Sequence, residues 1–170
     1  MRTRSIVFAA AIVAQVLLLL ALPANQYIAR FWGHEVQLRV EMLDPPSVLS
    51  GYYVRLRYEI SRPIGFDDFS AIADGTPIYT VVAPGIDGVA NAMSMSLEYP
   101  DARGNQHVIK GEKKGNDVVY AIGEYFIPEA ARNEVEQGLR DSNNDRRAIV
   151  RLDKRGNPSL RGLRIGDTRY

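Results

Sequence analysis

The chain has 170 residues, which is enough for one compact domain. It contains no cysteine and only two histidines, so disulfides, thiol catalysis and cysteine-based zinc or iron–sulfur sites are excluded. The formal net charge is +1, with nine basic and four acidic side chains in residues 140–170. A charge balance of this kind does not indicate binding to nucleic acid.

The amino terminus carries a candidate membrane span. An apolar run over residues 6–22 follows Arg2 and Arg4, and its length as a helix is roughly 25 Å, near the lower limit for crossing a bilayer. A cleaved signal peptide and a retained signal anchor are both compatible with this pattern. We expect retention, because Leu22 stands where a cleavage site requires a small residue. Residues 1–30 are thus predicted to form a cytoplasmic arginine flank and an anchor helix that contacts the lipid bilayer.

The arginine flank also predicts the orientation of the protein. Positive residues before a span stay in the cytoplasm, so residues 31–170 are expected to form an exported, β-rich domain. No second apolar run of this kind follows, which predicts a single-pass protein.

Beyond residue 31 the dominant pattern is alternation of apolar and polar residues, which is typical of half-buried strands. It predicts strands at 34–42 and 52–60. In the second strand, period two places Leu56 and Tyr58 on the inward face and Tyr53 on the outward face. Further strands are predicted at residues 78–82, 93–99, 107–112, 118–126, 147–152 and 160–165.

One segment has a helical pattern. Pro128 suits a first helical turn, Glu129 favours a helix amino end, and Ala131, Val135 and Leu139 fall on one face. Strands greatly outnumber helices. The sequence therefore predicts a mainly β protein with one short helix, arranged as a compact sandwich or barrel-like domain after a single N-terminal transmembrane helix.

Polar residues give no recognisable reactive or metal-binding pattern. His34 and His107 lie far apart at opposite ends of strands, without the spacing that brings metal ligands together. Asp67 and Asp68 are typical of a solvated turn. We therefore predict no catalytic residue, no metal ligand and no cofactor.

The predicted strands carry a basic strip. Arg39, Arg55 and Arg57 fall on the outward faces of two strands that we expect to pair. The interleaved acids Glu35, Glu41 and Glu59 are predicted to neutralise this strip.

A small hydrolase, of protease or carbohydrate-active type, is the alternative. Its site would have to use residues such as Ser47, Ser50, Glu124 and Glu129. A serine nucleophile also needs a positioned base, and glycosidase carboxylate pairs cannot be identified from spacing alone. Activity abolished by replacing one of these residues would favour the hydrolase.

Two sequence blocks resemble a known family. Residues 51–58 read Gly-Tyr-Tyr-Val-Arg-Leu-Arg-Tyr, and residues 120–129 read Tyr-Ala-Ile-Gly-Glu-Tyr-Phe-Ile-Pro-Glu. Both are similar to blocks of the GDYXXLXY family of bacterial membrane-anchored proteins. The resemblance implies a single amino-terminal span, an exported β-rich domain and no assigned activity. It also implies association with multi-pass membrane proteins.

Two acids of the family pattern are missing from this chain. Tyr52 replaces the aspartate of the first block, and Gly123 stands where the second block has glutamate. The residues that match are turn and packing types, which favours a structural role for the motif. They are Gly51, Tyr53, Leu56, Tyr58, Tyr125, Phe126, Pro128 and Glu129.

The sequence therefore predicts a non-enzymatic binding or accessory subunit. We expect it in the bacterial cytoplasmic (inner) membrane, with its amino terminus in the cytoplasm and most of the chain extracytoplasmic. The expected partner is a multi-pass membrane protein or a membrane complex, and no nucleic acid is expected to bind.

Overall fold

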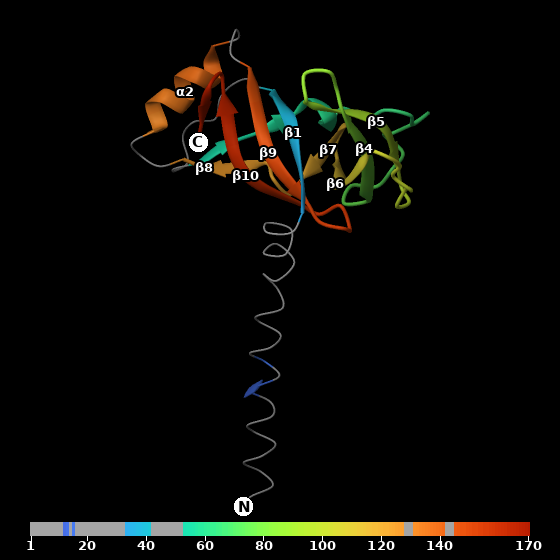
Figure 1. Ribbon diagram of the computed structural model, residues 1–170. Helices are drawn as coiled ribbons and strands as arrows, with labels where there is room; N and C mark the ends of the chain where they lie inside the picture. The colour runs from blue at the N-terminus through green and yellow to red at the C-terminus, as the bar shows by residue number, and fades with distance from the viewer. Residues whose placement is uncertain (1–11, 14, 16–32, 42–52, 128–130, 142–144) are drawn as a thin grey trace, which may run out of the picture.

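The computed structural model of the protein describes residues 12–13, 15, 33–41, 53–127, 131–141 and 145–170. Strands dominate these residues and form three open sheets, accompanied by one short α-helix (Figure 1). The prediction of a mainly β protein with one short helix is confirmed. The described sheets do not close, however, so the barrel-like arrangement is replaced by separate open sheets.

The predicted membrane span lies mostly outside the described residues. Residues 12, 13 and 15 are helical, and Ile12 and Val13 are exposed. Within the described part of the chain, no helix is long and apolar enough to cross a membrane.

The largest sheet is antiparallel and has the strand order β11–β10–β9–β1–β3. Its strands are β1 (His34–Glu41), β3 (Arg57–Tyr58), β9 (Arg146–Leu152), β10 (Pro158–Ile165) and β11 (Thr168–Arg169). The alternation predicted for β1 is confirmed, because Val36, Leu38 and Val40 are buried whereas Glu35 and Arg39 are exposed.

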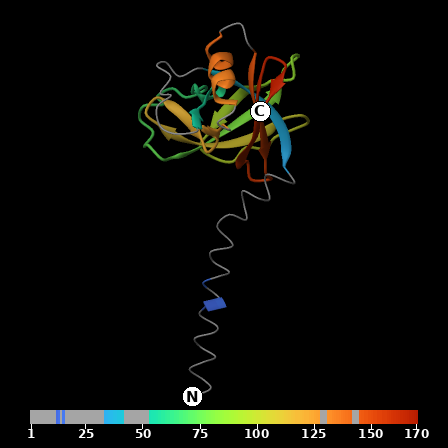
Figure 2. The ribbon, with the colours of Figure 1, turned by 90° about the vertical axis from the view of Figure 1, so that its left-hand side faces the viewer.

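A second antiparallel sheet has the order β5–β4–β6–β7. Its strands are β4 (Pro77–Pro84), β5 (Ala90–Ser96), β6 (His107–Lys114) and β7 (Asp117–Tyr120). The strand predicted at 93–99 thus begins and ends earlier. It stops at Ser96, whose hydroxyl donates to the Glu98 carbonyl at 2.6 Å. Figure 2 shows the strands of this sheet running across those of the five-stranded sheet.

Two predicted strands are interrupted. The described part of the strand predicted at 52–60 contains β2 (Tyr53–Arg55), β3 and most of the 3-10 turn η1 (Glu59–Ser61), and the strand predicted at 118–126 is divided into β7 and β8 (Glu124–Phe126). The break in the first falls at Leu56, whose N–H donates to the Gly123 carbonyl at 2.7 Å. On either side of this point, β2 pairs with β8 and β3 pairs with β1. The alternation of burial continues through the break, so period two alone could not reveal it.

The predicted helix is confirmed over its described part. Helix α2 (Arg132–Arg140) packs beside β10, with Val135 fully buried and Ala131 and Leu139 against the core. The contact with β10 is close, since a Cβ on Gly138 would lie 2.8 Å from the Ile165 side chain. Pro128 and Glu129 lie outside the described residues.

Apolar side chains from the two larger sheets, η1 and α2 form one hydrophobic core. Its fully buried members include Leu38, Tyr58, Ile78, Ile109, Val118, Val135, Val150 and Leu163. Burial of this apolar surface is the main stabilising term for such a domain.

Candidate functional site

The two sequence blocks singled out above lie against each other. Strand β2 from the first block pairs antiparallel with β8 from the second, and the register places Arg55 opposite Glu124 and Val54 opposite Tyr125. The bond from Leu56 N–H to the Gly123 carbonyl continues this contact beyond the strands. The blocks are about 65 residues apart in sequence and are joined only by tertiary structure.

Two buried tyrosines connect the second block to the first block and to the turn η1 that follows it. The Tyr58 hydroxyl donates to the Ile122 carbonyl at 2.7 Å, and the Tyr120 hydroxyl donates to the Ile60 carbonyl at 2.9 Å. Their rings meet edge to face with centroids 6.3 Å apart. Burial raises the pKa of both hydroxyls well above the ordinary value of tyrosine. Both groups therefore stay protonated and act as hydrogen-bond donors within the core.

A cleft of about 440 Å³ opens beside this junction. We call it the motif cleft. It is lined by residues of both blocks, of β7, of η1 and of the end of β6: Arg55, Leu56, Arg57, Tyr58, Ser61, Lys114, Asp117, Val118, Val119, Tyr120, Gly123 and Glu124.

The charges of the motif cleft are only partly paired. Arg57 donates to Asp117 at 2.7 Å, but the buried Nε of Arg57 has no hydrogen-bond acceptor among the described residues. Arg55 and Lys114 are exposed and have no ion-pair partner within the described part of the chain. The cleft therefore offers donors and positive charge that a bound acceptor could use.

Several residues considered from the sequence lie outside the described residues. Gly51, Ser47, Ser50, Pro128 and Glu129 are among them, as is the side chain of Tyr53, although its backbone forms part of β2.

The remaining motif residues are distributed between core and surface. Leu56 and Tyr58 are buried, and Tyr125 is half-buried against the core. Glu124 is exposed on the motif cleft, and Phe126 is exposed on β8.

The two histidines are closer together than the sequence suggested. The rings of His34 and His107 stack with centroids 5.0 Å apart, so the expectation that they lie far apart is wrong. Position along a strand cannot show which strand ends meet in space. No group of three or more potential metal ligands gathers within the described residues.

We expect the histidine stack to make stability depend on pH. Burial, and secondly the charge of His34, lower the pKa of His107 below 6.5. The unfolded chain therefore binds this proton more readily, so the stabilisation is complete above about pH 6.5 and is lost as pH falls through the folded pKa. The melting temperature should fall between pH 7.5 and 5.5, and His107→Gln should reduce this fall. If the melting temperature falls equally with pH in His107→Gln and in the parent chain, His107 is not the group responsible for the pH dependence.

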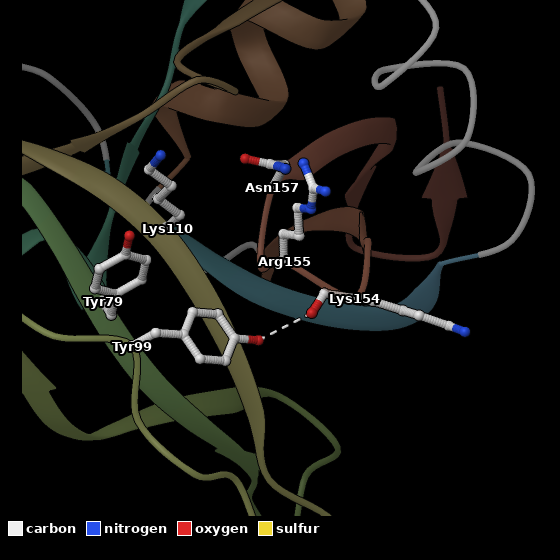
Figure 3. A pocket seen from close by; sticks show the side chains of 6 residues that line it. All are labelled: Tyr79, Tyr99, Lys110, Lys154, Arg155 and Asn157. Atoms are coloured by element: carbon white, nitrogen blue, oxygen red, sulfur yellow. Dashed lines mark hydrogen bonds between the residues drawn. The ribbon is translucent and has the colours of Figure 1, made fainter.

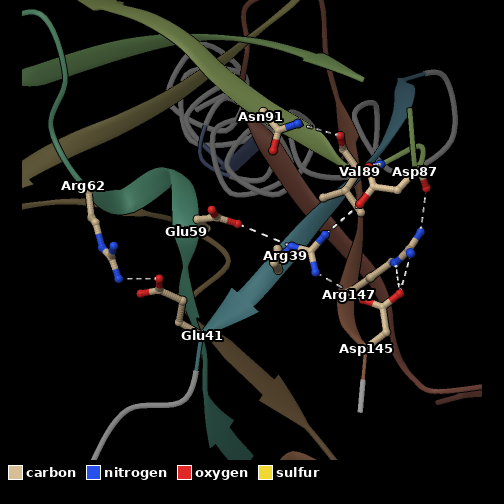
Figure 4. Close-up of polar contacts among 9 residues, drawn as sticks. All are labelled: Arg39, Glu41, Glu59, Arg62, Asp87, Val89, Asn91, Asp145 and Arg147. Carbon is tan, nitrogen blue, oxygen red and sulfur yellow. Dashed lines mark hydrogen bonds and ion pairs between the residues drawn. The ribbon is translucent and has the colours of Figure 1, made fainter. Parts of the chain in front are cut away.

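Arg39 and Arg57 of the basic strip are paired, largely with other acids than those predicted, whereas Arg55 has no ion-pair partner among the described residues. Figure 4 shows the contacts of Arg39. Arg39 pairs with Glu59 at 3.4 Å as expected, and with Asp87 at 2.7 Å and Asp145 at 3.8 Å. Arg147 hydrogen-bonds to Asp145, which lowers the pKa of that carboxyl, and donates to the Asp87 carbonyl at 3.0 Å. These contacts fasten the loop between β4 and β5 to β1 and β9.

The other predicted acids pair elsewhere. Glu41 accepts from Arg62 at 2.6 Å, and Glu35 lies 3.7 Å from Arg151. Asp68 caps its own turn by accepting from the hydroxyl and N–H of Ser70. Asp87, Asp117 and Asp145 lie between strands or at a strand end, and no local pattern indicated that they would meet arginines of distant strands.

Comparison with protein families found one match. A family model described as "GDYXXLXY protein" matches residues 15–163 of the chain. Comparison with curated proteins and with solved structures found no significant match.

Proposed function

The chain belongs to the GDYXXLXY family, and from this membership we propose that it is a non-enzymatic accessory subunit in the bacterial cytoplasmic membrane. Residues 6–22 anchor it, and the β domain, on the extracytoplasmic side, binds a membrane protein. The apolar run preceded by Arg2 and Arg4 supports the anchor and its orientation.

The observation that supports a non-enzymatic role is that the family motif residues have a structural position. Leu56 and Tyr58 are buried, and the Tyr58 hydroxyl is bonded to the Ile122 carbonyl. Tyr120 makes the corresponding bond from the second block to Ile60. The residues that define the family thus hold two sheets together and shape the wall of the motif cleft. A motif of this kind supports a binding module better than a catalytic centre.

Charge indicates the chemistry of the bound partner. Arg55 and Lys114 present positive charge at the motif cleft, and Arg57 has a buried donor without an acceptor among the described residues. We propose that an acidic extracytoplasmic segment of the membrane protein binds there, because its carboxylates would satisfy these donors.

Site-specific photo-cross-linking in membranes tests this proposal. A photoreactive amino acid at Val119, which is exposed on β7 at the cleft, should give an adduct with a membrane protein. The same probe at Met93, exposed on the opposite edge strand β5, is the control and should not. Arg55→Glu together with Lys114→Glu should reduce the Val119 adduct about fivefold or more. Adducts of equal yield at both positions would contradict binding at the motif cleft.

Two further measurements separate the proposal from its alternatives. A reporter fused at Tyr170 should be active only if it works after export, and a reporter active in the cytoplasm would exclude the orientation. The hydrolase alternative has one observation in its favour, since Glu124 and Asp117 both line the motif cleft. Substrate turnover by the purified chain that is abolished by Glu124→Gln would replace the proposed function with a hydrolase.

A further inference from the structure

A second pocket, distant in sequence from the family motif, combines aromatic and basic side chains. It has a volume of about 490 Å³, and we call it the loop pocket. It is lined by Tyr79 on β4, Tyr99 after β5, Lys110 on β6, and Lys154, Arg155 and Asn157 in the loop between β9 and β10. Figure 3 shows Lys110, Asn157 and Arg155 gathered on one side of the two tyrosine rings. The Lys154 side chain points away from the pocket, which Lys154 lines with its carbonyl group.

The walls of the loop pocket are held in place by specific contacts. Tyr79 and Lys110 are paired across β4 and β6, so their side chains share one face of the sheet. The Lys110 N–H donates to the Gly156 carbonyl at 2.8 Å, which holds the loop against β6. The Tyr99 hydroxyl donates to the Lys154 carbonyl at 3.1 Å. The pocket therefore joins the two larger sheets and does not depend on the loop alone.

The acid nearest to these cations in sequence is used within the loop. The Asp153 carboxylate accepts from the Arg155 N–H at 2.8 Å, and from the backbone N–H and side-chain amide of Asn157 at 2.8 and 2.7 Å. These bonds fix the loop conformation.

The two cations that face the loop pocket, Lys110 and Arg155, have no ion-pair partner in the part of the chain that the structure describes. By contrast, Arg39, Arg57 and Lys113 each contact a carboxylate at 2.7 Å. Unpaired cations beside tyrosine rings in one concave site are suited to an anion carried by a larger, partly apolar molecule.

The position of the loop indicates where that anion comes from. His34, the first residue of β1, is paired with Leu152, the last residue of β9, directly before the loop. The loop therefore projects from the end of the sheet at which the chain enters β1 (Figure 1). If residues 6–22 span the bilayer, this end of the domain is the one joined to the membrane anchor.

We propose that the loop pocket binds the phosphate group of an anionic phospholipid. The proposal rests on the membrane anchoring in the proposed function. Lys110 and Arg155 bind the phosphate oxygens, and the Tyr79 and Tyr99 rings contact the apolar part of the headgroup. This contact sets the orientation of the domain on the bilayer, which a single span leaves free.

Binding to the full chain in neutral maltoside micelles tests the proposal. The probes are inorganic phosphate, short-chain phosphatidylglycerol and, as a zwitterionic control, short-chain phosphatidylcholine. Dissociation constants are measured by calorimetric titration. Lys110→Glu with Arg155→Glu should weaken phosphatidylglycerol binding about tenfold or more. Arg55→Glu with Lys114→Glu makes the same charge change at the motif cleft and should alter it less than about twofold. Thermal unfolding of each variant shows whether it is folded.

Each result has a definite meaning. The proposal is supported if phosphatidylglycerol binds more tightly than phosphatidylcholine and this binding is lost only in Lys110→Glu with Arg155→Glu. Phosphate binding without preference for phosphatidylglycerol overturns the lipid source. Equal losses in both double variants, or no binding of any probe, overturn the site. The cross-link at Val119 is an independent measurement, so failure of the loop pocket is distinguishable from failure of the proposed function.

Discussion

Replacing Tyr58 with alanine is expected to lower the free energy of unfolding by about 3–5 kcal/mol, as for other large aromatic truncations in a core. The Tyr58 side chain is almost completely buried, packs against Tyr120 and donates to the Ile122 carbonyl. The substitution removes both the packing and the bond. Such a loss is a large share of the roughly 5–15 kcal/mol that stabilises a typical domain.

Two control variants test this prediction: one separates the contribution of the ring from that of the hydroxyl, and the other makes the same truncation at an exposed tyrosine. Tyr58→Phe keeps the ring and should cost about 1–3 kcal/mol, because the Ile122 carbonyl loses its donor. Tyr99→Ala makes the same truncation at a tyrosine that is 51% exposed and should cost much less than Tyr58→Ala. Chemical denaturation monitored by circular dichroism gives all three values. Similar losses for Tyr58→Ala and Tyr99→Ala would show that Tyr58 is not a core residue.

Replacing Gly156 with alanine is expected to cost about 2–4 kcal/mol, through two separate effects. Gly156 has a φ of +79°, a conformation that costs other L-residues about 1–2 kcal/mol. A Cβ there would also lie 2.9 Å from the Val108 carbonyl oxygen, which is backbone and cannot rotate away. The loop would have to move from β6, and the bond between Lys110 N–H and the Gly156 carbonyl would weaken.

Gly115→Ala is the matched control for the close contact. Gly115 also occupies a hairpin turn and has a φ of +60°, but nothing lies within 4 Å of its Cβ position. This variant should show only the backbone cost of about 1–2 kcal/mol. The difference between the two unfolding free energies measures the approach of the loop to β6. No difference would mean that the loop does not pack as closely as described.

Local sequence was sufficient to predict most of the individual elements. Alternation predicted β1 and the inward positions of Leu56 and Tyr58 because side chains on successive strand residues point to opposite faces. The spacing of Ala131, Val135 and Leu139 predicted the buried side of α2, because residues four apart lie on the same face of a helix. Both signals depend only on neighbours along the chain.

The candidate sites could be predicted only in part. The motif directed attention to Leu56, Tyr58 and Glu124, which line the motif cleft. It could not indicate Lys114 and Asp117, because they enter the cleft from the turn between β6 and β7. The loop pocket had no sequence signal, since its residues come from four separate segments.

The sequence by itself determined the mainly β composition, the short helix and the family, because each depends on local periodicity or a contiguous motif. Only the tertiary structure decided which strands pair, where residues 52–60 change sheets, and which carboxylates meet Arg39 and Arg57. A backbone donor such as Leu56 N–H can pair with many carbonyls, and an arginine with many acids. Packing of the whole core determines that Leu56 N–H pairs with Gly123 and that the two arginines pair with Asp87 and Asp117. No local sequence pattern contains this information.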